Sequence, residues 1–235
     1  MVIAHRGASG TCPENTLAAF RRAVDLGAPM VELDVQLTAD GEVVVIHDPT
    51  LERTTDGCGP VGDRTLAEIA CLDAGGWFGA AFRGERVPTL TEVLAAVPVG
   101  VNVELKPGPA RELEGRALAA VERAGALGRV VFSSFDPDSL LRLRQASAAA
   151  EVAVLLGAGS LPEALRLAER VAARALHLRN DRITPAAMAT IAPTGLPVRA
   201  WTVNDAVEFR RLATAGVSGV FTDHPERFLL RQRVE

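Results

Sequence analysis

The sequence predicts a single α/β domain built as a (β/α)8 barrel of the TIM type. Short apolar runs typical of buried parallel strands alternate with amphipathic helical stretches along the chain. The length of 235 residues is ample for one such barrel. The first apolar run is not followed by Gly-x-Gly-x-x-Gly, which argues against an open dinucleotide-binding sheet. We therefore expect one domain over residues 1–235, with a small inserted subdomain at about 50–88.

Nine segments have the pattern of a buried strand, one more than a closed barrel needs. They are Val2–His5, Met30–Val35, Val43–His47, Val101–Leu105, Val130–Ser133, Val152–Leu156, Ala175–Leu178, Val198–Val203 and Gly219–Thr222. Only a short turn at Asp40-Gly41 separates the second run from the third, and parallel neighbours need a crossover of a dozen or more residues. These two units must therefore depart from the regular repeat.

Helical patterns fill most of the other connections. They cover Thr16–Leu26, Leu90–Val97, Arg111–Ala124, Pro137–Ala146, Pro162–Ala172, Pro185–Ile191 and Asp205–Ala215. The first of these is preceded by Asn15, which we interpret as its N-cap. About fifty residues separate His47 from the strand at Val101. The stretch 50–88, rich in Gly, Asp and Thr, is therefore predicted to be an insertion over the C-terminal mouth of the barrel.

The bulk composition is that of an ordinary soluble globular protein, with 48% hydrophobic and 23% charged residues and a net charge of −4. No basic run indicates a nucleic-acid partner, and no apolar run approaches the roughly 20 residues of a membrane span. The three cysteines, Cys12, Cys58 and Cys71, are odd in number and widely spaced, which favours reduced thiols. The chain begins directly with a strand, so we expect a cytoplasmic protein without a signal peptide. The oligomeric state is not predicted.

Polar side chains follow an apolar run at four strand ends. They are His5-Arg6, Glu32-Leu33-Asp34, His47-Asp48 and Glu104-Leu105-Lys106. Residues two apart on a strand point to the same face, so Glu32 projects with Asp34 and Glu104 projects with Lys106. The intervening apolar residues face the helix layer. The polar pairs therefore face the barrel interior at its C-terminal mouth, where barrel enzymes place their catalytic groups.

The grouping predicts a metal site next to an acid–base pair. One polar residue at a strand end is usually structural, but four successive strands with polar ends are not explained in that way. The carboxylates of Glu32, Asp34 and Glu104 would repel one another without a cation, and carboxylate oxygens are the preferred ligands of hard divalent ions such as Mg²⁺ and Ca²⁺. The imidazoles of His5 and His47 then remain available for proton transfer.

Two cationic side chains complete the predicted site. Arg6 and Lys106 would supply positive charge to a phosphate oxygen. Lys106 is the only lysine among 25 basic side chains, and a compact ammonium is not interchangeable with a guanidinium. The ensemble indicates metal-assisted phosphoryl chemistry. Asp48 could orient the region of His47 or merely cap a turn.

The ordered motifs resemble those of the glycerophosphodiester phosphodiesterase family. The matching segments are Ala4-His5-Arg6-Gly7, Pro13-Glu14-Asn15-Thr16, Glu32-Leu33-Asp34, His47-Asp48, Glu104-Leu105-Lys106, Ser134-Phe135, Trp201-Thr202-Val203-Asn204 and Gly219-Val220-Phe221-Thr222-Asp223. The resemblance extends from Val2 to Pro225, and residues 50–88 occupy the position of the family's characteristic insertion. Trp201 matches a position that lines the family's pocket.

The resemblance implies hydrolysis of deacylated phospholipids such as glycerophosphocholine to glycerol 3-phosphate and an alcohol. It implies one divalent cation, Mg²⁺ or Ca²⁺, held by Glu32, Asp34 and Glu104. It also implies that His5 and His47 are the acid–base pair. The sequence does not distinguish acid from base. It also leaves open whether water or the glycerol 2-hydroxyl, by way of a cyclic phosphate, attacks phosphorus.

Three alternatives share parts of this pattern. A phospholipase of the sphingomyelinase D type has the same two-histidine layout, but the Pro13–Thr16 segment and the insertion favour a hydrolase of small diesters. A non-catalytic binding barrel would need no acid–base pair. An aldolase could use Lys106 as a Schiff base, but it would leave His5 and His47 without a joint purpose.

Overall fold

Eight parallel strands close into a barrel in the computed structural model, which describes residues 1–108 and 112–229. The strands are β1 (Val2–Ala4), β2 (Met30–Leu37), β4 (Gly100–Leu105), β5 (Val130–Ser134), β6 (Glu151–Leu156), β7 (Ala175–Arg179), β8 (Val198–Trp201) and β9 (Gly219–Thr222). Each pairs with the next in chain order, and β1 closes the ring by pairing with both β9 and β2. The prediction of a TIM-type barrel is confirmed.

The third apolar run, the one in excess of eight, lies outside the ring. Strand β3 (Val43–Val45) pairs antiparallel with the far end of β2, with Val35 opposite Val45 and Leu37 opposite Val43. An antiparallel neighbour needs only a tight turn, which is why Asp40-Gly41 suffices. Gly41 has φ +79°, a conformation that glycine adopts without steric cost. The irregularity in the sequence thus reflects a hairpin added to the second strand of the barrel.

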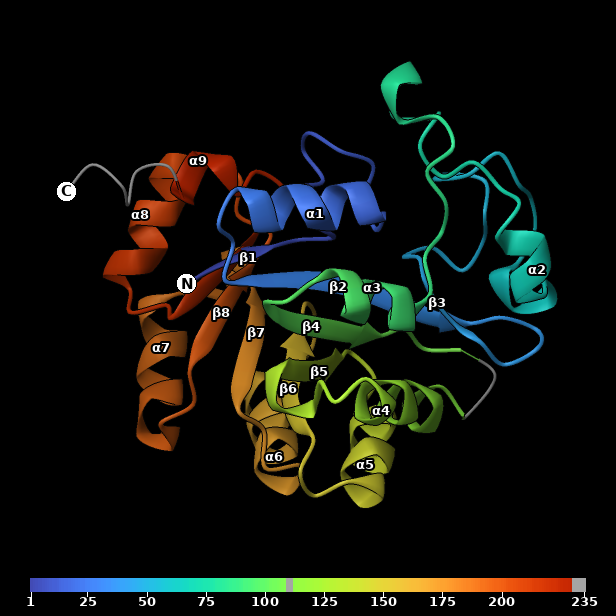
Figure 1. Ribbon diagram of the computed structural model, residues 1–235. Helices are drawn as coiled ribbons and strands as arrows, with labels where there is room; N and C mark the ends of the chain where they lie inside the picture. The colour runs from blue at the N-terminus through green and yellow to red at the C-terminus, as the bar shows by residue number, and fades with distance from the viewer. Residues whose placement is uncertain (109–111, 230–235) are drawn as a thin grey trace.

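Helices surround the ring and pack on its outer face (Figure 1). Their bounds are α1 (Leu17–Asp25), α3 (Leu90–Ala96), α4 (Leu113–Arg123), α5 (Pro137–Ala146), α6 (Leu161–Arg170), α7 (Pro185–Ile191), α8 (Ala206–Thr214) and α9 (Glu226–Leu229). The prediction that Asn15 caps α1 is wrong, because the Thr16 side chain accepts the hydrogen bond from the Ala19 amide. The predicted start of the fourth helix at Arg111 lies outside the described residues.

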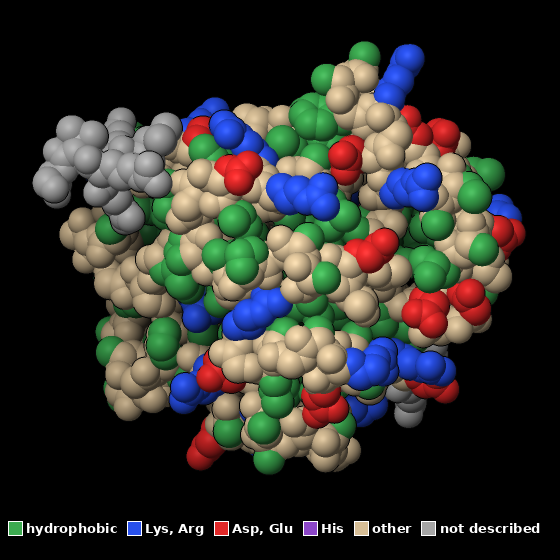
Figure 2. Space-filling model, in the orientation of Figure 1, with side chains coloured by type: hydrophobic (Ala, Val, Ile, Leu, Met, Phe, Trp, Pro, Cys, Tyr) green, Lys and Arg blue, Asp and Glu red, His purple; other side chains and the backbone are tan. Residues whose placement is uncertain are grey.

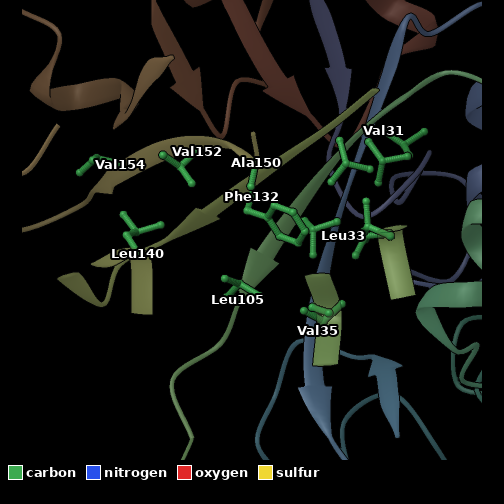
Figure 3. Close-up of a cluster of buried hydrophobic side chains, with 14 of the residues drawn as sticks. Val31, Leu33, Val35, Leu105, Phe132, Leu140, Ala150, Val152 and Val154 are labelled. Carbon is green, nitrogen blue, oxygen red and sulfur yellow. The ribbon is translucent and has the colours of Figure 1, made fainter. Parts of the chain in front are cut away.

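The alternation within β2 separates the core from the barrel interior. Val31, Leu33 and Val35 are fully buried between the strands and the helices, together with Phe132 and Leu105 from neighbouring strands (Figure 3). The residues between them on β2 point the other way, into the barrel. Burial of the apolar set against the helices therefore fixes which side chains of β2 face the interior.

Residues between β3 and α3 form the insertion, which lies beyond one end of the barrel, at the right of Figure 1. It contains the 3-10 turns η1 (Val61–Asp63) and η2 (Ala80–Phe82) and the short helix α2 (Leu66–Ile69). A second apolar cluster joins it to β3. This cluster comprises Val44, Ile46, Leu51, Val61, Ile69, Ala74 and Val87. The insertion thus has a small core of its own, continuous with the hairpin.

The surface carries both signs of charge interspersed with apolar side chains, as the face in Figure 2 shows. Among the described residues, no helix combines the length and the apolar character that crossing a bilayer requires.

We predict that Leu51→Ala loosens the insertion before it affects the barrel. Leu51 is 1% exposed within the small cluster, and truncating a buried leucine costs about 2–5 kcal/mol. Hydrogen exchange should show lost protection confined to residues 50–88. The exposed Val207→Ala on α8 is the control, because surface truncations change stability by about 0.5 kcal/mol or less. Uniform loss of protection across the barrel would contradict an independent small core.

Candidate active site

The turn after β1 places a backbone amide against one of the buried carboxylates. His5 still donates its amide to Thr222 in the neighbouring strand, and the chain then turns through Arg6 at φ +55° and Gly7 at φ +83°. A Cβ atom at Gly7 would lie 2.6 Å from the Ala19 carbonyl carbon, so only glycine fits there. In this turn the Arg6 amide donates to Oε2 of Glu32 at 2.8 Å.

Three buried carboxylates from two adjacent strands converge at the mouth. Glu32 and Asp34 come from β2 and Glu104 from β4, and Asp34 is directly paired with Glu104 in the sheet register. One carboxylate oxygen of each residue lies within 4.8 Å of the others, and the three residues are 2%, 0% and 9% exposed. Burial, reinforced by the charge of Asp34, raises the pKa of Glu32 and of Glu104.

Asp34 is held ionised by the cations and the amide around it. Nζ of Lys106 lies 2.9 Å from Oδ1 of Asp34, an ion pair without hydrogen-bond alignment, and also contacts Glu104. Nε of Arg6 lies 3.2 Å from Oδ2 of Asp34, and the Asn15 amide donates to the same oxygen at 2.8 Å. Burial acts to raise the pKa of Asp34, but Lys106 and Arg6 outweigh it and lower this pKa well below its usual range.

His5 is anchored through its Nδ1 atom. This nitrogen lies 2.7 Å from Oδ1 of Asp223, and Nε2 lies 4.0 Å from Oε2 of Glu32. Asp223 in turn accepts hydrogen bonds from Asn204 at 2.6 Å and from Ser9 at 3.1 Å. Burial lowers the pKa of His5, but Glu32 and Asp223 outweigh that effect, and the net shift is upward. The arrangement leaves Nε2 as the ring nitrogen available for proton transfer.

His47 is anchored in the same way on the opposite flank. Its Nδ1 lies 2.6 Å from Oδ1 of Asp48, so this aspartate orients the ring rather than only capping a turn. Burial lowers the pKa of His47, and the positive charges of Arg6 and Lys106 add to that effect against the carboxylates of Asp34 and Asp48. The two imidazoles therefore have pKa values displaced in opposite directions.

A single pocket collects these groups. Its lining comprises His5, Arg6, Glu32, His47, Asn102, Glu104, Lys106, Phe135, Leu155, Trp201, Thr202 and Phe221. The polar side comes from the first half of the barrel. Phe135 and Trp201, which meet edge to face at 5.4 Å between ring centroids, form part of an apolar side. Of the eight predicted site residues, seven line the pocket and Asp34 lies buried behind Lys106.

Sequence reasoning did not assign the residues that hold the site in place. Asp223 and Asn204 lie in family motifs that do not by themselves indicate a role, and the position of Asn15 before a helix indicates only a cap. Arg53, in the insertion, was not singled out. It donates to both Glu14 and Asp48. Most of these contacts join residues 19 or more positions apart, and all of them involve loop residues, so strand periodicity gives no signal for them.

Comparison with known proteins identifies the family. The profile of the Glycerophosphoryl diester phosphodiesterase family matches residues 5–227. The chain belongs to this family. It is 42% identical over 234 residues to a glycerophosphodiester phosphodiesterase of Caldanaerobacter subterraneus subsp. tengcongensis, covering 97% of this chain and 96% of that protein. It is 35% identical to a glycerophosphodiester phosphodiesterase of Bacillus subtilis, with 97% and 85% of the two chains covered.

Solved structures agree with this assignment. An Oleispira antarctica phosphodiesterase in complex with the product sn-glycerol-3-phosphate superposes with a TM-score of 0.94, at 32% identity and over 99% of this chain and 96% of that one. A glycerophosphodiester phosphodiesterase of Agrobacterium tumefaciens gives a TM-score of 0.83 at 31% identity, over 97% and 98% of the two chains. The protein is an enzyme of the glycerophosphodiester phosphodiesterase class, which excludes the non-catalytic binding barrel.

We predict that Asn15→Ala destabilises the protein more than Asn15→Gly does. Both variants lose the amide that donates to buried Asp34, a hydrogen bond to a charged group worth about 1.5–3 kcal/mol. Asn15 has φ +58°, and a side chain other than Asn or Gly costs about 1–2 kcal/mol more in this region. Urea denaturation should resolve the difference. Equal losses for the two variants would show that the backbone relaxes.

Proposed function

We propose that this enzyme hydrolyses glycerophosphodiesters to sn-glycerol 3-phosphate and an alcohol, using one divalent cation and the two histidines. The observation that carries the proposal is the geometry of the pocket. Two imidazoles, each anchored through Nδ1 to a carboxylate, flank a buried cluster of three carboxylates. The product bound to the Oleispira antarctica relative fits the same chemistry. Glycerophosphocholine is the substrate that we expect to be accepted.

The acidic cluster fits a hard divalent cation, Mg²⁺ or Ca²⁺. Glu32, Asp34 and Glu104 offer oxygen ligands, and burial together with the charge of Asp34 raises the pKa of the two glutamates, which is the electrostatic setting that a bound cation would relieve. A cation bound there supplies positive charge to a phosphate oxygen. Arg6 and Lys106 line the same pocket and add to the field that a phosphate anion experiences.

The opposite pKa displacements support a division of labour between the histidines. His47, whose pKa is lowered, favours the neutral imidazole and accepts a proton from the attacking hydroxyl. His5, whose pKa is raised, favours the imidazolium form and donates a proton to the leaving alkoxide. The hydroxyl belongs to water or to the glycerol 2-position. Phosphorus NMR for a transient cyclic phosphate distinguishes these routes.

The apolar side of the pocket suits the carbon skeleton of glycerol. Trp201 is held by a hydrogen bond from its Nε1 to the carbonyl of His177, and Phe135 packs against its ring. These two side chains present hydrocarbon opposite the charged groups that address phosphate. The Schiff-base alternative finds no support. Lys106 forms ion pairs with Asp34 and Glu104, and these pairs raise its pKa in spite of burial.

We predict that His5→Ala and His47→Ala each reduce kcat about 10²- to 10⁴-fold with the fold intact. The pH dependence of the residual activity should show which histidine is the base and which is the acid. A base must be deprotonated, so its removal abolishes the acid limb of the pH–rate profile, and this limb is assigned to His47. An acid must be protonated, so removal of His5 abolishes the alkaline limb. The measurement is the pH dependence of glycerophosphocholine hydrolysis.

His224→Ala is the control for loss of an imidazole, since the His224 side chain pairs with Glu226 and does not line the pocket. Near-wild-type rates for both His5→Ala and His47→Ala would refute the acid–base assignment. If His5→Ala lost the acid limb and His47→Ala lost the alkaline limb, only the assignment of base to His47 and acid to His5 would be refuted.

We predict that Glu32→Gln stabilises the metal-free protein near pH 8 yet abolishes stabilisation by added cation. The folded pKa of Glu32 is raised, so wild-type stability falls as the pH rises through it, whereas the neutral amide has no such loss. The melting temperature should rise by about 2–4 °C for each kcal/mol recovered. Thermal melts with EDTA, Mg²⁺, Ca²⁺ and Mn²⁺ provide the test. A cation-dependent shift that survives in Glu32→Gln would contradict the ligand assignment.

A further inference from the structure

The catalytic pocket depends on a side chain supplied by the insertion. We propose that Arg53 is a positioning residue that fixes the orientation of His47 through Asp48, and that it couples this histidine to Arg6 through Glu14. The inference rests on the proposed function for its kinetic consequences, and on the geometry alone for its structural ones. It gives the insertion a part in the chemistry beyond covering the mouth.

The guanidinium of Arg53 binds two carboxylates at once. Its Nε and one terminal nitrogen lie 2.5 and 3.1 Å from the two oxygens of Asp48. Its two terminal nitrogens lie 2.7 and 2.8 Å from the two oxygens of Glu14. Both contacts are therefore bidentate, the geometry in which arginine gives the most directional pairing and which lysine cannot reproduce.

Each of these two carboxylates also binds a residue that lines the pocket. Oδ1 of Asp48 accepts a hydrogen bond from Nδ1 of His47 at 2.6 Å. Glu14 accepts from Arg6 at 2.8 Å, and Arg6 contacts Asp34. Without Arg53, Glu14 would keep its bond from Arg6 and Asp48 its bond from His47, but no cation would join the two carboxylates, and their like charges would repel. The chain of contacts therefore spans the pocket from the proposed base to the phosphate-binding cation.

The turn that carries Arg53 is itself anchored. Leu51 is buried in the small cluster and donates its amide to Gly59. The Thr55 hydroxyl and amide both bond to the Leu51 carbonyl, at 2.7 and 3.0 Å. The core of the insertion thus presents Arg53 from a defined backbone position. Its side chain is 43% exposed, and exposed ion pairs add little to stability, so its contribution lies in orientation.

The test compares Arg53→Ala with Arg64→Ala. Arg64 lies in the same insertion, pairs with Glu68 and does not contact the pocket residues, so it controls for losing a guanidinium there. Arg53→Ala is expected to lower kcat about 10- to 100-fold with an unchanged melting temperature, as when a partner that orients a reactive side chain is removed. Arg64→Ala should retain the wild-type kcat.

Chemical rescue separates positioning from folding. Because the Arg53 site is open to solvent, free guanidinium at concentrations far below denaturation should bind between the two carboxylates of Arg53→Ala. It should then restore a saturable part of kcat. Sodium chloride and urea at equal concentration are the controls for ionic strength and for shape without charge. Arg53→Lys should remain impaired, since an ammonium cannot make both bidentate contacts.

A second readout does not depend on turnover. The hydrogen-bonded Nδ1 proton of His47 should give a low-field NMR signal in the wild type and in Arg64→Ala, assigned by its loss in His47→Ala. The signal should be lost in Arg53→Ala and return with guanidinium. Its persistence in Arg53→Ala, or a wild-type kcat for that variant, would overturn the inference. Inactivity of the wild type itself would instead refute the proposed function and leave the NMR result to decide this one.

Discussion

The structure depends on the compensation of negative charge in a buried mouth. Glu32, Asp34 and Glu104 approach one another where water is largely excluded, and Lys106 and Arg6 neutralise only part of their charge. Asp34 takes most of that compensation, which leaves the two glutamates with raised pKa values. Apolar residues in place of this cluster would make the folded protein more stable. The site instead retains an electrostatic cost that a divalent cation can relieve.

The same charge distribution distinguishes the two histidines. Both rings are anchored at Nδ1 by an aspartate, so the hydrogen bond alone would not separate them. Burial lowers the pKa of both rings. At His5 the carboxylates of Glu32 and Asp223 outweigh burial, whereas at His47 the charges of Arg6 and Lys106 reinforce it against Asp34. One pair of identical side chains thus acquires opposite protonation preferences from its neighbours, a pattern typical of acid–base catalysis.

Much of the fold was predictable because it rests on local periodicity. Alternating β2 residues must face either helices or barrel interior, so burial of Val31 and Leu33 alone places Glu32 and Asp34 together. The hairpin of β2 and β3 was visible only as a short turn that no crossover could explain. Asn15 was misinterpreted because a residue before a helix is usually a cap. Its actual partner is Asp34, 19 positions away.

The sequence by itself determined the barrel, the strand ends that carry chemistry and the family. These follow from spacing along one segment, or from motifs in a fixed order. Only the tertiary structure decided which aspartate holds each histidine, how Arg53 joins Glu14 to Asp48, and how charge is shared within the acidic cluster. The physical reason is that pKa values and ion pairs depend on distances between atoms from separate strands and loops. Closure of the barrel sets those distances, and no periodicity within a segment records them.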